Sequence, residues 1–449
     1  MRMSGQLVRA AFAGALGGLL FGFDTAVIAG TTDSLVHKYS LGSAELGVTV
    51  SIALIGTVIS AATAGIVGQN LGSRATLRLT ALLYILSSIG SAFALAWPML
   101  LVARFIGGLG IGASSVVGPV YIAEIAPPSW RGRMVGMFQI NIVVGILLAY
   151  LSNYGVQNLD LGPIEWRVQF GVAILPAILF FSMLFGIPQS PRWLITRGRT
   201  DEARASLEKI GSPDPETELR EITAAVQDAK GGHGESLFSV RYAFPIFLAL
   251  SIGAFNQFSG INAILYYLND IFAAAGFSRL SGGAQAVAVG LVNMLATFAA
   301  MSVIDRMGRK KLLLIGSVGT AAALSGVAAI FAKQEHQEWL LPLLIFYIFS
   351  FAISQGAVIW VYISEIFPSS VRAKGQALGC SAHWVTNALI AFTFPIIAKH
   401  SHALPFVVFA VMMCAQFIVV LAVYPETKGI SLEALEKKLG LTGKVAQTS

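Results

Sequence analysis

Apolar segments long enough to cross a lipid bilayer recur along the whole sequence. A helix that spans a hydrocarbon core of roughly 30 Å needs about 20 apolar residues. Lipid offers no hydrogen-bond partners, so the backbone of each such segment has to form a helix. The sequence therefore predicts an all-α membrane protein with twelve transmembrane helices. Their expected ranges are 9–30, 44–68, 77–96, 98–123, 135–153, 168–187, 243–273, 284–304, 311–333, 340–364, 374–398 and 404–423.

The composition agrees with this fold class and excludes a soluble one. Of the 449 residues, 55% are hydrophobic and 12% are charged, whereas soluble domains carry about 25% charged residues. The first apolar segment lacks a small-residue cleavage site, so we expect a retained helix and not a signal peptide. Cys380 and Cys414 both lie in apolar segments, which argues against a disulfide framework. We expect neither a metal nor another cofactor.

The net charge of +7 follows a topological pattern and not that of a nucleic-acid-binding protein. If both termini are cytoplasmic, most Lys and Arg residues fall in cytoplasmic segments, as the positive-inside rule requires. Arg104 is the exception, because it lies within the fourth apolar segment. With no N-x-S/T site present, we expect a multi-pass protein of the bacterial inner membrane, with the lipid bilayer and no nucleic acid as a partner.

An internal repeat divides the chain into two halves. The sequence YIAEIAPPSWR at 121–131 returns as YISEIFPSSVR at 362–372, at the ends of the fourth and tenth apolar segments. Two related six-helix halves around an axis along the membrane normal place a binding site between them, near the midplane. The expected parts are an N-terminal six-helix bundle at 1–190, cytoplasmic linker helices at 191–242, a C-terminal six-helix bundle at 243–424 and a cytoplasmic tail helix at 425–449.

Short helices are expected in the linker and the tail. Residues 201–211 and 215–230 have helical spacing with mixed charges, as in solvent-exposed helices. Residues 231–234 are expected to form a Gly-rich joint. In the tail, residues 431–439 predict one more helix.

Charged residues at the cytoplasmic ends of the spans predict a gate. Corresponding glycine-containing loops at 69–74 and 305–310 follow the second and eighth apolar segments. Ion pairs between helices at this end would latch the two halves together and break when the inside opens. The alternative is that these charges only satisfy the positive-inside rule. The expected gating residues on this side are Glu124, Arg131, Asp305, Arg309, Glu365 and Arg372.

The polar side chains within the apolar segments are mainly amides, which both donate and accept hydrogen bonds without carrying charge. Sugar hydroxyls do the same, so this set suits a neutral polyol better than an ion. Tryptophans inside the spans can cover the apolar face of a pyranose. The alternative for each amide is a hydrogen bond that only holds two helices together. The expected substrate-binding residues of these two kinds are Gln139, Asn256, Gln257, Asn262, Asn293, Asn387, Trp360 and Trp384.

Gly260 is expected to bend the seventh span between two of these amides, because a broken helix beside amides is how a gated membrane site is built. Tyr266 and Tyr267 follow toward the outside and are expected to close over the cavity. Phe21 in the first span is expected to line the site. For these three aromatic residues, ordinary helix packing is the alternative.

His383, in the eleventh apolar segment, has three possible roles. Its ring N–H could bind the sugar, or the imidazole could be a second proton site that titrates near neutrality. The third alternative is a histidine whose ring is only packed between helices.

One acid, Asp24, lies near the middle of the first apolar segment. A charge at that depth costs about 2.5–3.5 kcal/mol, so such a residue usually faces the protein interior and has a function there. We hypothesise that deprotonated Asp24 pairs with Arg104 and that protonation frees an outward-facing, sugar-ready arrangement. Proton affinity would then depend on conformation, which is what couples proton and sugar movement. The alternative is a buried acid kept for structure.

The chain resembles the sugar porter family of the major facilitator superfamily over essentially its whole length. The resemblance rests on FGFDTAVIAG at 21–30, PVYIAEIAP and RGR within 119–133, PQSPRWL at 188–194, NQFSGIN at 256–262, DRMGRKK at 305–311, the block at 362–372 and PETKG at 425–429. It implies the major facilitator fold with two six-helix bundles, alternating access and a hexose- or pentose-like substrate. Asp24 with Arg104 is similar to the pair of proton-coupled members.

The sequence departs from the family pattern at four places. Asn256 replaces the first of two glutamines in the seventh span, and His383 replaces a Gln or Asn in the eleventh. Ala173 occupies a place that is acidic in some proton symporters. The loop at Gly72 has lost part of its charged motif. The first two departures bear on the identity of the sugar, the third leaves coupling to Asp24 and Arg104, and the fourth bears on the latch of the N-terminal half.

These features predict a proton-coupled symporter of a monosaccharide, glucose or a related hexose, that works as a monomer by alternating access. Its partners would be a small neutral sugar and protons. A facilitative uniporter without proton coupling is the close alternative, and a non-transporting membrane sugar sensor is a remote one. An intramembrane enzyme is not expected, because neither a metal-ligand spacing nor a Ser–His–Asp set lies at membrane depth.

Overall fold

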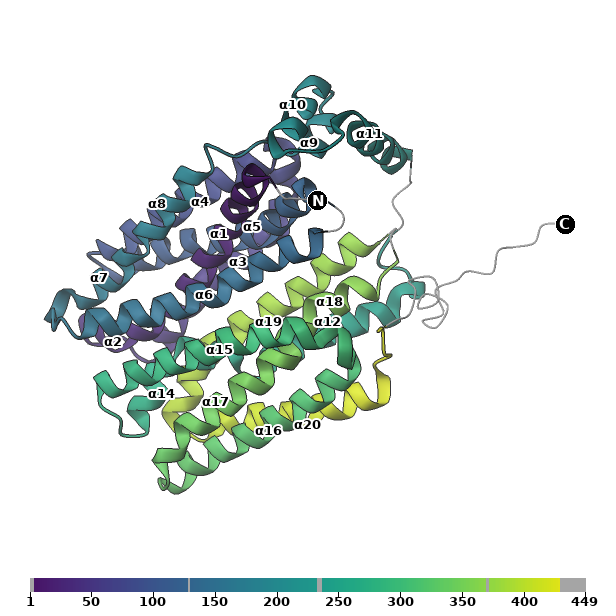
Figure 1. The fold of residues 1–449 in the computed structure, drawn as a ribbon. Helices are drawn as coiled ribbons and strands as arrows, with labels where there is room; N and C mark the ends of the chain where they lie inside the picture. The colour runs from purple at the N-terminus through teal and green to yellow at the C-terminus, as the bar shows by residue number, and fades with distance from the viewer. Residues whose placement is uncertain (1–3, 128–129, 232–235, 369–370, 429–449) are drawn as a thin grey trace. The chain divides into compact units, whose positions relative to one another are not determined.

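The computed structural model describes residues 4–127, 130–231, 236–368 and 371–428 (Figure 1). All regular secondary structure in these ranges is helical. Twelve helical segments within them are long and apolar enough to span a membrane, which confirms the predicted fold class. Their bounds are Gly5–Gly30, Ser43–Leu71, Ser73–Ala92, Trp97–Ile125, Arg131–Gln157, Gly162–Met183, Val240–Tyr266, Arg279–Ile304, Arg309–Lys333, Gln337–Glu365, Lys374–His400 and Leu404–Val423.

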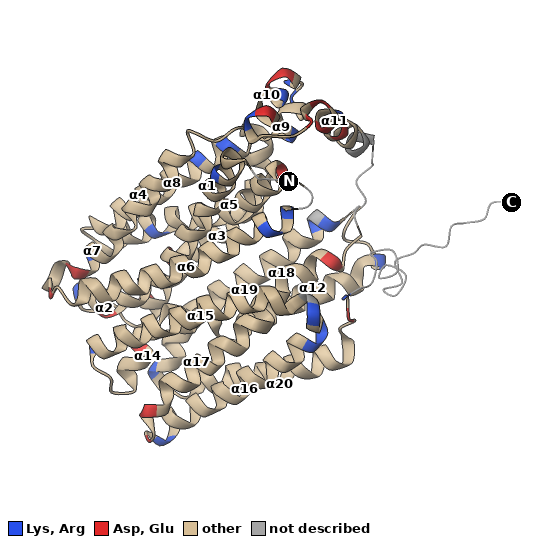
Figure 2. Cartoon of the chain, viewed as in Figure 1, with Lys and Arg blue, Asp and Glu red and all other residues tan. Residues whose placement is uncertain are grey.

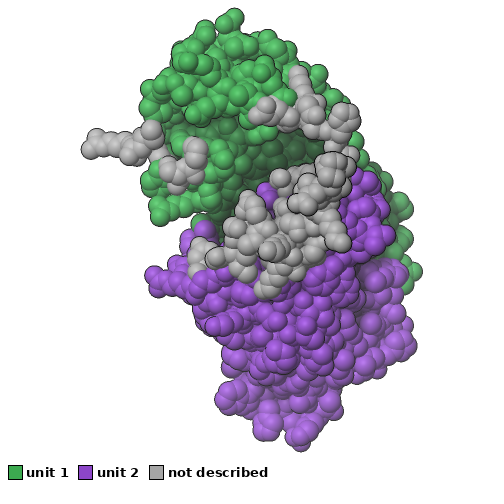
Figure 3. All heavy atoms as spheres, turned by 90° about the vertical axis from the view of Figure 1, so that its right-hand side faces the viewer, with its two compact units in different colours: residues 1–233, 265–273, 277–290 green, residues 234–264, 274–276, 291–449 purple. Residues whose placement is uncertain are grey.

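The chain forms two compact units, which Figure 3 colours separately. Unit 1 comprises residues 1–233, 265–273 and 277–290, and unit 2 comprises residues 234–264, 274–276 and 291–449. Parts of the seventh and eighth spans thus belong with the first six. The four-part division at residues 190, 242 and 424 stays a prediction, because these units are defined by contacts and not by those boundaries.

The centre of unit 1 is α1 (Gly5–Val27), which packs along α5 (Trp97–Ile125) and α6 (Arg131–Gln157). Close approach depends on glycine: a Cβ on Gly22 would collide with the backbone oxygen of Ile142 on α6. In the first span 78% of the apolar window is buried, against 39% in the second. A polar side chain on α1 therefore meets protein and not lipid. The other spans of this unit are α3 (Ser43–Leu71), α4 (Ser73–Ala92) and the pair α7 (Glu165–Val172) and α8 (Ile174–Met183).

In unit 2, α12 packs against α19 and α16 packs against α20 and α17. An apolar core that includes Leu248, Val358 and Phe367 joins them. α15 is the eighth span, and its first residues belong to unit 1. The helices of these spans are α12 (Ala243–Phe258), α15 (Arg279–Met307), α16 (Arg309–Lys333), α17 (Leu340–Phe351), α18 (Ala357–Glu365), α19 (Arg372–His400) and α20 (Leu404–Val423).

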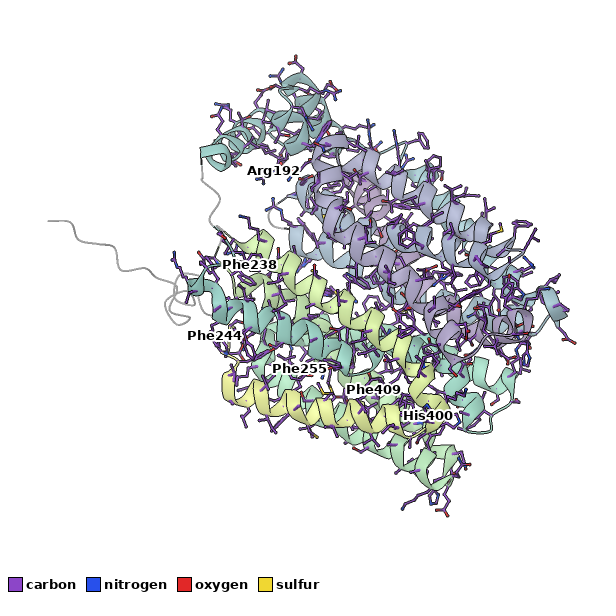
Figure 4. The ribbon with its side chains drawn as sticks, turned by 180° about the vertical axis from the view of Figure 1, so that it is seen from behind. Arg192, Phe238, Phe244, Phe255, His400 and Phe409 are labelled. Atoms are coloured by element: carbon purple, nitrogen blue, oxygen red, sulfur yellow. The ribbon has the colours of Figure 1, made fainter. Side chains whose placement is uncertain are left out.

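Three spans are interrupted within the described residues. The sixth breaks at Ala173, between α7 and α8. The seventh breaks at Gly260, whose φ of +84° is strained for any residue with a Cβ, and continues as α13 (Ile261–Tyr266), where the span ends. The short helix α14 (Leu268–Ala274) follows it. The bend at Gly260 is the predicted one. Phe409 of α20 (Figure 4) fills the space where a side chain at Gly260 would lie. The tenth span contains a π-turn at Ala352–Gly356, which the sequence did not predict. Such turns are frequent at functional sites.

Some span ends differ from their predicted positions. The third span runs from Ser73 to Ala92 instead of 77–96, and the eighth starts at Arg279 instead of 284. Hydropathy discounts charged residues, but Arg74 and Arg78 lie within α4, and their side chains donate to the backbone oxygens of Ile187 and Leu184, which follow α8. Hydropathy marks the lipid-facing length of a span, whereas hydrogen bonding sets where its helix begins.

The linker folds into α9 (Pro191–Thr196), α10 (Thr200–Ile210) and α11 (Pro215–Gly231). The last two are the predicted helices, and α9 is additional. Figure 2 shows mixed charges on these helices and few within the spans. Trp193 and Arg197 both donate to the backbone oxygen of Gln69, so α9 is fixed to the end of α3. Most of the predicted joint at 231–234 lies outside the described residues. The predicted tail helix at 431–439 lies wholly outside them.

In unit 1, the end at which the sixth span meets the linker carries the turn at Gly72, and in unit 2 the end at which the chain enters the seventh span carries the turn at Gly308. This end of each unit is called the linker end below. The opposite end carries α2 (Thr32–Tyr39) and α14.

Candidate functional site

Asp24 on α1 and Arg104 on α5 form a buried ion pair within unit 1. The Arg104 Nη1 lies 2.6 Å from the Asp24 Oδ1, and the two side chains are 3% and 16% exposed. The guanidinium also lies over the Phe170 ring, 5.6 Å from its centroid. The acid thus points into protein, as a functional intramembrane charge should.

The pair is not fully satisfied, because the Arg104 Nε is buried without a hydrogen-bond partner among the described residues. Removing one charge of a buried pair leaves the other uncompensated, which is strongly unfavourable. Uptake of a proton by Asp24 would therefore weaken the hold on Arg104. The arrangement is able to link protonation to a local rearrangement, although the role of the two residues stays a prediction.

The amides of unit 2 form a chain of hydrogen bonds. The Asn262 Nδ2 donates to the Gln257 Oε1 at 3.1 Å, and the Gln257 Nε2 donates to the Asn256 Oδ1 at 3.1 Å. The Asn256 Nδ2 in turn donates to the backbone oxygen of Gln355 in the π-turn at 3.3 Å. The break at Gly260 and the π-turn thus bring polar groups from the seventh and tenth spans together.

His383 on α19 joins this chain. Its ring nitrogens lie 3.2 Å from the Gln257 Nε2. The imidazole also packs against Trp360, with ring centroids 5.1 Å apart, and perpendicular to Trp384 at 5.0 Å. A ring held by an amide and two indoles is well fixed in orientation, so it can present a polar edge in a defined direction.

The predicted substrate residues are divided between the two units. Six of them, Asn256, Gln257, Asn262, Trp360, His383 and Trp384, gather in the cluster of unit 2. Asn293 on α15 and Asn387 on α19 belong to unit 2 as well and are buried, at 7% and 1% exposed. Gln139 on α6 and Phe21 on α1 lie in unit 1, where both are half-buried.

Sequence reasoning missed Gln355, although it is an amide within an apolar segment like the others. Its Nε2 contacts the Met413 sulfur at 3.2 Å, and its Oε1 is buried without a hydrogen-bond partner among the described residues. A buried acceptor of this kind costs free energy until a donor reaches it. A complete inventory of intramembrane amides would have found it.

Tyr266 and Tyr267, the predicted lid, are buried at 4% and 1% exposed. Tyr266 ends the seventh span and Tyr267 follows it, and both belong to unit 1. There the Tyr150 hydroxyl donates to the backbone oxygen of Leu265 at 2.8 Å. Their gating role stays a prediction.

At the linker end of unit 2, the Arg309 Nη2 lies 3.0 Å from the Glu365 Oε1, which is an ion pair of the predicted kind. The other Glu365 oxygen accepts from the Thr427 hydroxyl at 2.6 Å. Arg372 instead donates to the backbone oxygen of Phe367. The side chain of Asp305 lies outside the described residues.

Glu426, in the PETKG motif, caps the start of α16 and was not predicted. Its carboxylate accepts from the backbone N–H groups of Arg309 and Lys310, at 2.9 and 3.1 Å. Burial raises the pKa of Glu426, but backbone N–H donors outweigh it and bring the pKa below its usual range. Glu426 follows the last span in irregular backbone, where no periodicity marks it.

At the linker end of unit 1, Glu124 accepts a hydrogen bond from the Ser73 hydroxyl at 3.3 Å. Arg131 is exposed at the start of α6. Where unit 2 has the Arg309–Glu365 pair, the described contact of Glu124 is with a hydroxyl, and the gating role of this half stays a prediction. The sequence explains the difference, because Ser73 stands where unit 2 has Arg309.

Comparison with known proteins covers nearly the whole chain. Residues 10–439 match the family model described as "Sugar (and other) transporter". The chain is 34% identical to the D-xylose-proton symporter of Escherichia coli K12 (94% of this chain, 93% of the relative). It is 35% identical to the arabinose-proton symporter of Bacillus subtilis (96% and 95%) and 34% identical to the glucose transporter GlcP of Staphylococcus epidermidis (95% and 96%).

Solved structures show the same likeness. The inward-open xylose transporter XylE from E. coli superposes with a TM-score of 0.85 at 33% identity, over 95% of this chain and 98% of that one. XylE bound to 6-bromo-6-deoxy-D-glucose gives 0.80 at 32% identity, over 98% of this chain and 100% of that one.

Proposed function

Because the chain belongs to the sugar transporter family, we propose that it is a proton-coupled symporter of monosaccharides that works by alternating access. The buried Asp24–Arg104 pair carries the proposal. Two of the relatives just named are proton symporters of xylose and arabinose by their names. A facilitative uniporter has no need of an ionisable pair at this depth, where charge is costly.

Protonation of Asp24 is the proposed coupling step. While the carboxylate is charged, it holds Arg104 through a charge-assisted hydrogen bond. Once a proton binds, the attraction is lost and α1 can shift relative to α5. Proton binding and the change of access then influence each other by the same free energy, as linkage requires.

The cluster of amides, His383 and the two tryptophans in unit 2 supports the sugar part of the proposal. Its side chains offer donors and acceptors without charge, and each hydrogen bond contributes about 0.5–1.5 kcal/mol. Several such bonds give useful but reversible affinity. A glucose-like hexose is the proposed substrate, and competition of aldohexoses, pentoses and fructose against labelled glucose identifies the sugar.

The proposed location is the bacterial inner membrane, with both termini and the linker end in the cytoplasm. The charge distribution supports this orientation, because the loops and helices of the linker end carry most of the Lys and Arg residues. The opposite end is then extracellular. The proposed working form is a monomer.

The experiment that tests coupling is Asp24→Asn in proteoliposomes. We expect it to abolish uphill sugar uptake driven by an inward proton gradient and to leave counterflow exchange of labelled sugar, because exchange needs no net proton movement. Glu335→Gln, at an exposed acid, is the matched control and should behave as wild type. Accumulation that survives in Asp24→Asn contradicts the coupling and favours the uniporter.

A further inference from the structure

At the end opposite the linker, a second buried acid is held by a neutral hydroxyl and not by a cation. The Asp270 Oδ1, on α14, accepts a hydrogen bond from the Thr32 hydroxyl of α2 at 3.0 Å. The residue is partly exposed, but its Oδ2 is shielded from solvent and has no hydrogen-bond partner among the described residues. Asp270 is part of neither the Asp24–Arg104 pair nor the cluster of amides, His383 and tryptophans in unit 2, so the proposed function assigns it no role.

The segment that carries Asp270 is docked on unit 1. Residues 265–273 and 277–290 belong to this unit by their contacts, and Leu268 and Phe272 are fully buried. Arg279 pairs with Glu165 of α7, with 2.5 Å between Nη2 and Oε1, and thereby holds the start of α15. The docking therefore combines apolar burial with polar contacts, and of the two acids in these contacts Glu165 is paired with a cation whereas Asp270 accepts from a hydroxyl.

The groups that face Asp270 favour its neutral form. On α2 the acid Asp33 is close enough to act as a like charge, and Asp33 itself lies 3.4 Å from the exposed His37. Tyr267, on the same segment as Asp270, is a buried neutral phenol. Burial raises the pKa of Asp270 to about 7, the Thr32 hydroxyl opposes this, and Asp33 adds to it.

We propose that Asp270 is a second proton site, separate from Asp24, whose protonation stabilises the docked state of residues 265–273 on unit 1. When the carboxyl is protonated, its burial beside Thr32 and Asp33 carries no charge penalty. When it is ionised, a shielded carboxylate beside a second acid is drawn toward water, and the segment is released. External acidity thus favours closure of the extracellular end, and neutral or alkaline conditions favour its opening.

The direction and the size of the pH effect on docking of residues 265–273 follow from linkage. An undocked, solvated Asp270 has the ordinary pKa of 3.8, and the docked one has a pKa of about 7. The docked state therefore binds more protons between these values, and its stability falls as pH rises through this window and levels off above it. Between pH 5.5 and 7.5 the docking equilibrium weakens by about twentyfold.

The test is counterflow exchange at equal pH on both sides of the proteoliposome membrane, in an Asp24→Asn background. We expect the exchange rate to rise with pH and to level off near pH 7, because release of the segment opens the extracellular end. With Asp270→Asn added, the side chain is neutral at every pH, so exchange should be slow and independent of pH. A rise that persists with Asp270→Asn overturns the proposal.

Two neighbouring variants keep the test decisive if Asp270→Asn does not fold. Asp33→Asn removes the like charge and should move the levelling-off to lower pH. Thr32→Val removes the hydroxyl that stabilises the carboxylate and should move it to higher pH. If neither variant shifts the profile, the proposal is wrong.

His37→Gln is the matched control, since histidines ordinarily change charge between pH 5 and 8; here the pH dependence should persist. Hydrogen-exchange protection of residues 265–273, corrected for the intrinsic rate, should decrease with pH in the same window and lose that dependence in Asp270→Asn. The proposal needs sugar exchange but not proton coupling. Uphill uptake in an Asp24→Asn protein would refute the coupling and leave the Asp270 profile to be judged separately.

Discussion

The two turns that begin α4 and α16 occupy corresponding places in the two halves, but they are held by different chemistry. Both contain a glycine with positive φ, Gly72 at +83° and Gly308 at +91°. The turn at Gly308 is capped by the carboxylate of Glu426. The turn at Gly72 is capped by the neutral amide of Gln189, whose Oε1 accepts from the backbone N–H of Arg74 at 3.1 Å.

The difference extends to the glutamate that both copies of the internal repeat contain, Glu124 and Glu365. Glu365 pairs with Arg309 in unit 2, whereas in unit 1 Glu124 accepts from the Ser73 hydroxyl and has Arg192 near enough to act as an opposite charge. The same turn is therefore held by an ion pair and a carboxylate cap in unit 2, and by a carboxylate–hydroxyl hydrogen bond and an amide cap in unit 1. Charge-assisted hydrogen bonds are roughly twice as strong as neutral ones. The turn at Gly308 should therefore be held more firmly than the turn at Gly72, and its stability should be more sensitive to pH and salt.

The largest effect is expected from Glu365→Gln. Arg309 then keeps its charge in a mostly buried place without its carboxylate, which costs about 1.5–3 kcal/mol. The matched change in the other half, Glu124→Gln, breaks none of the described ion pairs and keeps an acceptor for the Ser73 hydroxyl, so it should cost only about 0.5–1.5 kcal/mol. Unfolding of the two variants in detergent, measured against wild type, checks the difference. Equal losses would mean that charge does not distinguish the two turns.

A smaller effect is expected from Glu426→Gln, which gives the turn at Gly308 the neutral cap of its counterpart. The carboxylate's backbone bonds are weakened, at a cost of about 1 kcal/mol at neutral pH. Because the pKa of Glu426 is lowered in the folded protein, its contribution is present above the ordinary pKa of 4.5 and is lost as pH falls through the folded pKa. Wild type and variant should therefore converge in stability only when the pH falls below the lowered pKa of Glu426 in the folded protein, which unfolding measured from neutral pH downward can check.

These contacts also mark how far the sequence could predict the molecule. The number of spans and the expected partner of Asp24 follow from rules that depend on the bilayer, because lipid penalises every exposed backbone group and charge. That constraint is absent outside the lipid. Glu426 and Gln189 lie in irregular backbone, and Asp270 lies beyond the last apolar turn of its span, so neither hydropathy nor periodicity identifies what they contact.

Within the spans, sequence reasoning failed for a different reason. The π-turn at Ala352–Gly356 adds a residue to a helical turn without a glycine–proline signal at its centre, and it decides where Gln355 points. The amides could be named from the sequence, but their mutual hydrogen bonds depend on two local irregularities of backbone. Of these two irregularities, only the break at Gly260 has a signature in the sequence, which is a glycine flanked by the amides Gln257 and Asn262.

The smallest effect, and the one of opposite sign, is expected from Gln189→Glu. The residue already accepts from the N–H groups of Arg74 and Ser190, both at 3.1 Å, and a carboxylate would accept the same bonds with added charge. A negative charge at the start of α4 is also favoured by the helix dipole. We expect about 0.5 kcal/mol of added stability at pH 7, which disappears near pH 4. A loss of stability instead would show that the Gln189 Nε2 makes a contact that a carboxylate cannot replace, and the two turns would then differ by more than the charge of their caps.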